Sequence, residues 1–305
     1  MPVSKNRRKF GIAKKSRAAA AVSGPAPLPP LPDRRAMERL LKAFGGGSVD
    51  DAVSKAQDIM YDAWDADSKA RRVALAKKAL KVSPLCADAY VLLAQEIAGH
   101  LDEEIELYQK GVDAGERVLG AAAFRDDVGH FWGLLETRPY MRARCGLALA
   151  LWQKGEQEAA IAHVQDMLRL NPNDNQGIRY ILLAWFLARG RQDGIASLMR
   201  RYKGDSAPQW RYTEALLEFR RVGDADTSRK RLAAAVRGNP HIPAYLLGKA
   251  LPRSAPAYLT VGGEDEAREF ARAYLASWRD TPGALEWLAV QTGPRGAARP
   301  TARPQ

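Results

Sequence analysis

The stretch from Gly129 to Arg144 holds the residue types best suited to chemistry or recognition. An arginine guanidinium can bind a carboxylate through two parallel hydrogen bonds, and arginine with aromatic side chains commonly anchors protein interfaces. The candidates are His130, Trp132, Glu136, Arg138, Tyr140, Arg142 and Arg144. We therefore expect this stretch either to bind a partner or to connect helices with its aromatic side chains buried.

These two interpretations assign different tasks to the same side chains. In the first, the stretch is a loop on a concave surface, where Arg138 and Arg142 hold a partner carboxylate beside Trp132 and Tyr140. In the second, the aromatic side chains fill the core and Glu136 neutralises Arg138. A third interpretation makes His130 and Glu136 the acid and base of an enzyme, which requires a partner within hydrogen-bond reach.

A second polar cluster runs from Asn171 to Gln176. Asparagine and aspartate before a helix accept hydrogen bonds from its free backbone N–H groups, so capping is the simplest explanation. A calcium site would need more carboxylates, because Asp174 is the only charged residue of the cluster. Asn175 and Arg179 lie one helical turn apart and are candidates for contacts with an extended peptide in a groove.

The sequence shows no pattern typical of catalysis, metal binding or cofactor binding. The histidines are isolated, and Gly45–Gly47 lacks the Lys-Ser/Thr pair of a phosphate-binding loop. Two cysteines, Cys86 and Cys145, exclude a disulfide scaffold and indicate a reducing, cytoplasmic compartment. We expect both to be small buried side chains, and we expect no enzyme activity, no metal, no cofactor and no small-molecule substrate.

The net charge of +12 is concentrated at the two ends of the chain. Residues 1–35 carry nine basic residues and one acid, residues 293–305 carry three arginines, and the remaining 257 residues are almost neutral. The bases that could contact a phosphate backbone are Lys5, Arg7, Arg8, Lys9, Lys14, Lys15 and Arg17, which we call the basic tail. Binding of nucleic acid is therefore an alternative that concerns the basic tail alone.

Composition also divides the chain. Residues 1–35 are basic and proline-rich, and residues 293–305 lack large apolar side chains, so both segments are expected to be disordered. Residues 36–51 combine a short amphipathic helix with a glycine-rich linker. No apolar run approaches the ~20 residues that a membrane-spanning helix needs.

From residue 52 to residue 292 the apolar pattern is helical, with a repeat near 34 residues. Helices are expected to end at Ser83-Pro84, Asn171-Pro172 and Asn239-Pro240, because proline cannot continue the hydrogen-bond ladder. Counted from these prolines, small and bulky residues fall at the positions typical of tetratricopeptide repeats. The clearest matches are Leu147, Ala148, Leu151, Ala160, Val164, Met167, Tyr212, Ala215, Leu216, Phe219, Ser228, Leu232 and Ala235. The period breaks between Gly120 and Pro139, and Glu264–Arg279 is expected to be the closing helix.

Two longer strings go beyond the general repeat. Leu168–Tyr180 contains Asn-Pro-Asn-Asp-Asn-Gln-Gly, and Asn239–Gly248 begins Asn-Pro-His-Ile-Pro. With Gly263–Ala267 and Trp278–Glu286, they resemble the suppression-of-tumorigenicity-seven family and its bacterial tetratricopeptide relatives over about residues 85–290. Eukaryotic members look like membrane proteins, whereas this chain shows no span, so the resemblance implies the repeat fold and no catalytic activity.

Together these patterns predict an all-α, tetratricopeptide-like solenoid of six to seven helical hairpins between disordered basic ends. The function expected from it is that of a scaffold whose concave groove binds a peptide or a protein surface. The alternative is a nucleic-acid- or ribosome-associated factor that binds through the basic tail.

Overall fold

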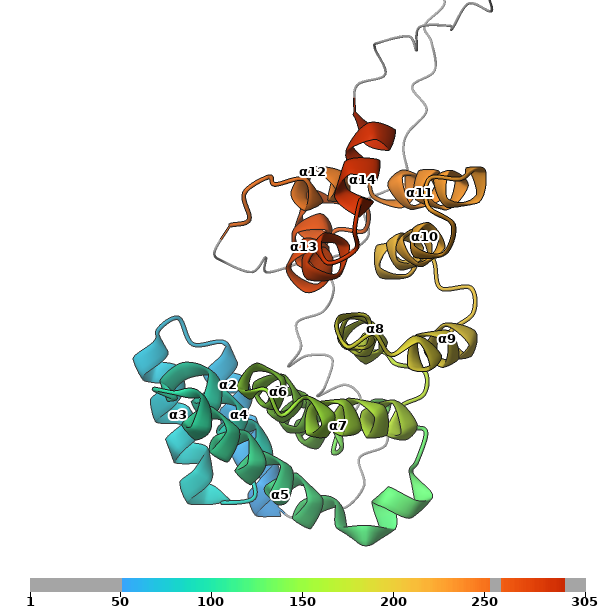
Figure 1. The fold of residues 1–305 in the computed structure, drawn as a ribbon. Coiled ribbons are helices and arrows are strands. Elements are labelled where there is room, and N and C mark those ends of the chain that lie inside the picture. The colour runs from blue at the N-terminus through green and yellow to red at the C-terminus, as the bar shows by residue number, and fades with distance from the viewer. Residues whose placement is uncertain (1–50, 253–258, 294–305) are drawn as a thin grey trace, which may run out of the picture.

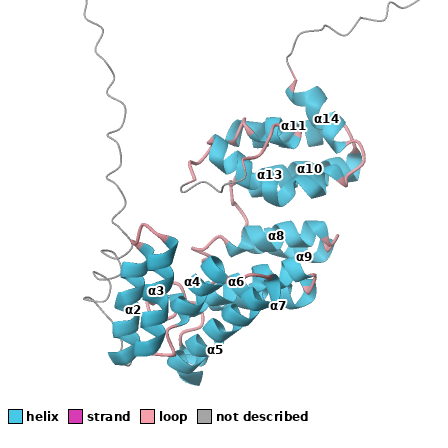
Figure 2. Cartoon of the chain, turned by 90° about the vertical axis from the view of Figure 1, so that its left-hand side faces the viewer, coloured by secondary structure: helices cyan, strands magenta, loops and turns pink. Residues whose placement is uncertain are grey.

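The computed structural model describes residues 51–252 and 259–293 of the 305-residue chain. The basic tail, the predicted helix and glycine-rich linker before residue 51, and the C-terminal tail lie outside the described residues. The described part is entirely helical apart from turns and loops, as Figures 1 and 2 show. The all-α prediction is therefore confirmed for this part of the chain.

Thirteen helices make up the described residues, and most pack against the next helix in the chain. They are α2 (Asp51–Trp64), α3 (Lys69–Val82), α4 (Ala87–Ile97), α5 (Leu101–Asp126), α6 (Arg138–Lys154), α7 (Gln157–Leu170), α8 (Ile178–Ala188), α9 (Gln192–Arg201), α10 (Pro208–Val222), α11 (Asp226–Gly238), α12 (Ile242–Leu246), α13 (Glu264–Arg279) and α14 (Ala284–Thr292). They form six sequential pairs, from α2–α3 to α12–α13, with α14 following the last pair.

The pair α6–α7 shows how local sequence builds a hairpin. Gly155 ends α6 in the left-handed conformation (φ 91°), which glycine adopts without steric cost. Ala148 and Ala160 are fully buried, and Leu147 and Val164 pack beside them. Small residues at the crossing let the two helices approach, and the larger ones fill the space around it. The side chains expected between these helices are thus buried as predicted.

The break that the sequence predicts after Gly120 is a kink inside a long helix. Gly120 has φ 67° and ψ 166°, outside helical values, yet helical structure resumes and continues to Asp126. Residues 127–137 then form turns that lead to α6. The irregular segment is therefore shorter than the predicted interval, because its first seven residues extend α5 in a new direction.

Helix α13 makes contacts that nearest-neighbour stacking does not predict. It packs against both α8 and α10, and Figure 2 shows it beside them. The Tyr274 hydroxyl donates a hydrogen bond to the Tyr180 carbonyl at 2.7 Å, and Phe270 stacks on Tyr274 with ring centroids 4.7 Å apart. The prediction that Glu264–Arg279 closes the chain is wrong, since α14 follows and buries Trp287 and Leu288.

Helices α5 and α6 approach each other closely at Gly115. A Cβ atom added there would lie 2.8 Å from Cβ and 3.0 Å from Cα of Tyr140. Because one of these atoms is backbone, a rotamer change of Tyr140 cannot relieve the clash. Gly115 is therefore required by packing.

We expect Gly115→Ala to lower the free energy of unfolding by about 1–3 kcal/mol, because overpacking outweighs the better helix propensity of alanine. The matched control is Gly238→Ala in α11, where an added Cβ meets nothing within 4 Å. That variant should be unchanged or more stable by up to about 1 kcal/mol. Urea titration followed by circular dichroism measures both, and equal effects at the two positions would contradict the packing argument.

Among the described residues, no helix combines the length and apolarity needed to cross a membrane.

Candidate functional site

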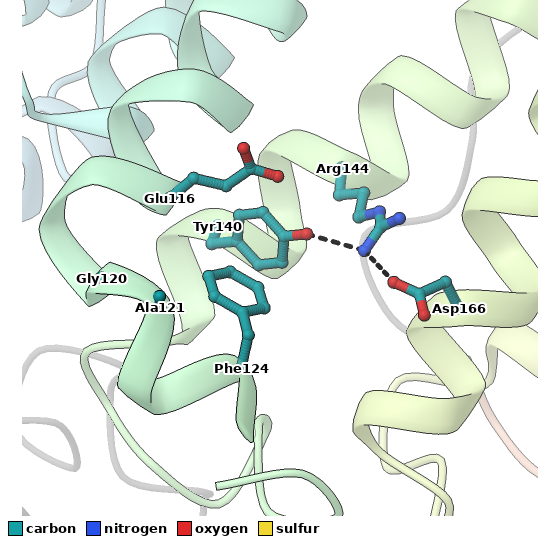
Figure 3. A pocket seen from close by; sticks show the side chains of 7 residues that line it. All are labelled: Glu116, Gly120, Ala121, Phe124, Tyr140, Arg144 and Asp166. Carbon is teal, nitrogen blue, oxygen red and sulfur yellow. Dashed lines mark hydrogen bonds and ion pairs between the residues drawn. The ribbon is translucent and has the colours of Figure 1, made fainter. Parts of the chain in front are cut away.

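A surface pocket of about 340 Å³ lies where the kinked end of α5 meets α6 and α7. We call it the Tyr140 pocket. Figure 3 shows Phe124 and Tyr140 side by side as its aromatic wall, with Glu116 above and the Arg144–Asp166 pair opposite. The kink at Gly120 turns the last residues of α5 and so places Phe124 against Tyr140, with ring centroids 5.1 Å apart.

One hydrogen-bonded chain crosses the pocket from α6 to α7. Arg144 Nη1 donates to the Tyr140 hydroxyl at 2.7 Å and also pairs with Asp166. Burial raises the pKa of Tyr140 to about 12, so its hydroxyl keeps a proton that it can donate to a ligand. Burial opposes the charge of Asp166, but hydrogen bonds from Arg169 and Arg144 outweigh it and hold the carboxyl pKa below its usual value.

The charges that line the pocket are two carboxylates and one guanidinium. Arg144 forms an ion pair with Asp166, whereas Glu116 is exposed and makes no hydrogen bond or ion pair with any described residue. His163 lies behind Arg144, whose Nε donates to its Nδ1 at 3.2 Å. Burial and the Arg144 charge lower the pKa of His163, so this imidazole is neutral at pH 7. The pocket therefore presents one carboxylate without an ion-pair partner, Glu116, beside aromatic rings.

The stretch from Gly129 to Arg144 divides between core and surface. Phe131 and Tyr140 are buried, and the Thr137 hydroxyl donates to the Phe131 carbonyl. Arg138 donates to the Trp132 carbonyl at 3.1 Å and stacks over the indole ring of the same residue. Most of these groups therefore stabilise the connection between α5 and α6, as the second interpretation expects.

Arg142 meets a carboxylate of its own chain. Its Nε donates to Asp88 Oδ1 at 2.7 Å and its Nη2 to Oδ2, while Gln57 donates to the same carboxylate at 2.8 Å. The Asp88 side chain is fully buried, and Arg142 also lies over the Trp64 ring. The two-pronged geometry expected of Arg142 is present, but it joins α6 to α2 and α4.

Arg179 is likewise held within the molecule. It binds Asp174 and Asp205 at 2.8 and 2.7 Å and lies over the Tyr180 ring. The backbone carbonyl of Tyr180 accepts a hydrogen bond from Tyr274 of α13. Burial opposes its charge, but hydrogen bonds to Asp205 and Asp174 raise its pKa above its already high value. Asn175 is exposed beside this cluster, as is Asn173, so both are open to a partner.

Capping explains the polar cluster before α8. Asp174 adopts a left-handed backbone (φ 49°), and its carboxylate accepts hydrogen bonds from the backbone N–H groups of Ile178 and Arg179 at 2.7 and 2.9 Å. These bonds satisfy donors that the first helical turn leaves free. Within the described residues, no three potential metal-ligating side chains come together.

The remaining candidates are His130, Glu136 and the two cysteines. His130 is exposed, Glu136 is half-buried, and no hydrogen bond joins them. Burial raises the pKa of Cys86 to about 12 and that of Cys145 to about 11, which disfavours both thiolates. Cys86 precedes the first turn of α4 and is buried, whereas Cys145 lies within α6 and is half-buried.

Sequence reasoning identified Tyr140 but missed its neighbours Glu116, Phe124 and Asp166. They come from two helices, α5 and α7, and nothing in their local spacing distinguishes them from ordinary surface residues. Gly120 was the one available signal, since a glycine between two helical patterns indicates a change of direction.

Residues 51–252 and 259–293 thus form an all-helical array of sequentially packed helix pairs, with a pocket at a helix kink that is lined by aromatic rings and carboxylates. The ST7 protein family matches residues 47–294, and the chain belongs to this family. It is 26% identical over 275 residues to Protein ST7 homolog of Caenorhabditis elegans, covering 76% of this chain and 50% of that protein.

Vertebrate relatives show the same level of similarity. The chain is 26% identical over 260 residues to Suppressor of tumorigenicity 7 protein-like of Bos taurus, covering 78% of this chain and 47% of the relative. It is 26% identical over 284 residues to Suppressor of tumorigenicity 7 protein of Macaca fascicularis, covering 78% and 53%. The chain therefore spans about half the length of the curated relatives that it matches.

Proposed function

We propose that this chain is a non-enzymatic interaction scaffold that binds a peptide or a protein surface, and that the Tyr140 pocket is one of its contact points. The observation that carries this proposal is an unpaired carboxylate beside two aromatic rings at the surface of three packed helices. Rigid helices hold these groups in place before a partner arrives, which reduces the entropy lost on binding.

The chemistry of the pocket favours a positively charged side chain of the partner. Glu116 supplies a negative charge without an ion-pair partner among the described residues, and the face of Phe124 attracts cations, whereas Arg144 already lies over the buried Tyr140 ring. The Tyr140 hydroxyl can donate a hydrogen bond to a neighbouring carbonyl of the same peptide. This assignment replaces the partner carboxylate expected from the sequence, because Arg142 already binds Asp88.

We also infer that the helix pairs are tetratricopeptide-like. Small residues are required where paired helices cross, and they are buried in two of the helix pairs. These residues are Ala148 and Ala160 in α6–α7, and Ala215 and Ala235 in α10–α11. Such hairpins cannot bury both faces alone and gain stability by stacking. The packing of α13 on α8 and α10 modifies this arrangement near the C-terminal end.

A second candidate function rests on the charge distribution of the sequence. The segment 1–35 carries a net charge of +8, whereas residues 36–292 are nearly neutral. Counterion release by such a tail would support binding to nucleic acid or a ribosome, with an affinity that falls steeply as salt increases.

The test compares affinity purification and mass spectrometry of the full chain with its Glu116→Lys variant. Charge reversal should lower the recovered amount of partners that depend on the pocket by roughly tenfold or more. The reason is that a positive side chain at this position repels the partner's cation, which Glu116 attracts. The control is Asp58→Lys on α2, which makes the same charge change at an exposed residue with no ion pair among the described residues. Nuclease treatment removes proteins that co-purify through nucleic acid.

The outcomes separate the two functions. Nuclease-resistant partners lost only from Glu116→Lys would support the scaffold proposal. Partners retained by Glu116→Lys but lost when the seven residues of the basic tail are changed to glutamine would favour the second function. Equal recovery from Glu116→Lys and Asp58→Lys would show that the Tyr140 pocket is not a contact point.

A further inference from the structure

A long groove of about 1110 Å³ lies near the C-terminal end of the described chain, between α11, α12 and the last turn of α14. We call it the α11 groove. Figure 1 shows these three helices together at one end of the molecule, away from α5–α7 and the Tyr140 pocket. The groove is therefore a surface separate from the one proposed above.

The floor of the groove is apolar. Val236 and Leu247 line it together with alanine and proline side chains, and Leu247 is 43% exposed. Of the eight large apolar residues that are exposed in the described chain, Leu247 lines this groove. Apolar surface collected in a groove is typical of an interaction site.

The rim of the groove is positively charged. Arg229, Lys230 and Arg237 line it, and no acidic residue does. Arg229 forms an ion pair with Asp224, with its Nε 2.8 Å from Oδ1. Lys230 and Arg237 are exposed and form no ion pair or side-chain hydrogen bond with the described residues. Lys230 and Arg237 stand seven residues apart, which places them two turns apart on one face of α11. An occupant with negative charge at this spacing would meet both.

The groove also favours an occupant whose backbone N–H and C=O groups form hydrogen bonds with each other. An extended peptide would need hydrogen-bond partners for its N–H and C=O groups. The apolar floor provides none from its side chains, and the neutral polar side chains of Gln291 and Thr292 lie at one end. A helix makes these bonds internally and presents apolar side chains every three or four residues. The residues of α11 that line the groove run from Arg229 to Arg237, which extends about 12 Å, or roughly two helical turns.

We propose that the α11 groove binds an amphipathic helix of a partner, with an apolar face on the groove floor and acidic residues beside Lys230 and Arg237. The ends of this chain are unsuitable occupants by charge, since residues 1–35 carry +8 and residues 293–305 carry +3. This proposal extends the scaffold function to a second surface. It depends on neither Glu116 nor Tyr140, so either proposal can fail alone.

The test measures binding of labelled synthetic peptides to the full chain by fluorescence anisotropy. The first probe is a 16-residue helical peptide with leucines on one face and glutamates on the flanks. The second is a scrambled peptide of the same composition whose leucines do not share a face, and the third has lysines in place of glutamates. The first probe should bind at least tenfold more tightly than either of the others.

Two variants test the groove itself. Lys230→Glu/Arg237→Glu should weaken binding of the first probe roughly tenfold, because two favourable charge contacts become repulsive. Leu247→Asp should weaken it by a similar factor by placing a charge on the apolar floor. The matched control is Arg71→Glu/Lys78→Glu on α3, which has the same residue types and spacing at two exposed positions outside the α11 groove. It should bind the first probe as the unaltered chain does.

Several results would overturn the proposal. Binding that is equal for the first and scrambled probes, or equally reduced by the two double variants, would indicate general attraction to a basic protein. Loss of binding only when the basic tail is changed to glutamine would assign the probe to that tail. Light scattering that shows a dimer of the full chain, dissociated by Leu247→Asp, would assign the groove to a second copy of this protein.

Discussion

Replacing Asp88 with alanine should lower the free energy of unfolding by about 3–5 kcal/mol. The Asp88 carboxylate is fully buried and accepts hydrogen bonds from Arg142 and Gln57, so it joins α4 to α6 and α2. The Arg142 side chain is 15% exposed and would keep its positive charge with little solvent to replace the lost carboxylate. A buried charge that loses its partner carries a large desolvation cost.

Urea titration followed by circular dichroism measures this loss, with Asp58→Ala on α2 as the control. Asp58 is exposed, and its removal should change stability by no more than about 0.5 kcal/mol. The double variant Asp88→Ala/Arg142→Met should recover part of the stability, because it removes both charges and keeps an apolar side chain against Trp64. A loss below about 1 kcal/mol for Asp88→Ala would contradict a stabilising role for the pair.

Replacing Phe131 with alanine should cost a similar amount, about 3–5 kcal/mol. Its ring is fully buried, with centroids 5.1 Å from Phe124 and 6.0 Å from Tyr140. These three rings fix the end of α5 against the start of α6, and the Phe131 N–H donates to the Leu170 carbonyl at the end of α7. Truncation would leave a cavity in the core that supports the wall of the Tyr140 pocket.

The preceding residue provides the control for this substitution. His130 is exposed, so His130→Ala should change stability by no more than about 0.5 kcal/mol. The same urea titration distinguishes a binding loop from a core segment. A binding loop would tolerate both substitutions, whereas a core segment would tolerate only His130→Ala. Similar stability of the two variants would show that residues 129–137 contribute little to the folded core.

The helical segments and their ends were readable from the sequence because their causes are local. Apolar spacing at three and four residues predicts a helix, and Asn171-Pro172 and Asn239-Pro240 lie where α7 and α11 end. The small residues at helix crossings, such as Ala160 and Ala235, were assigned to contacts and are buried. Capping before α8 followed from the residue types, and Asp174 performs it.

The candidate site could not be assembled from the sequence. In the sequence, Arg142 is equally consistent with binding a partner's carboxylate and with pairing with Asp88, because its guanidinium binds either carboxylate in the same way. Those two residues are separated by 54 positions, and only the packing of α4 against α6 brings them together. The same holds for Glu116 and Asp166, which reach Tyr140 from different helices.

By itself, then, the sequence determined most of the helices, although not α14, and the separation of basic ends from a neutral body, since each depends on residues that are neighbours in the chain. The tertiary structure decided which charged side chains form ion pairs inside the molecule and which face the solvent. It pairs Arg142 and Arg179 with internal carboxylates and leaves Glu116, Lys230 and Arg237 without partners among the described residues. The physical reason is that desolvation and ion pairing depend on distances between helices, which local sequence does not contain.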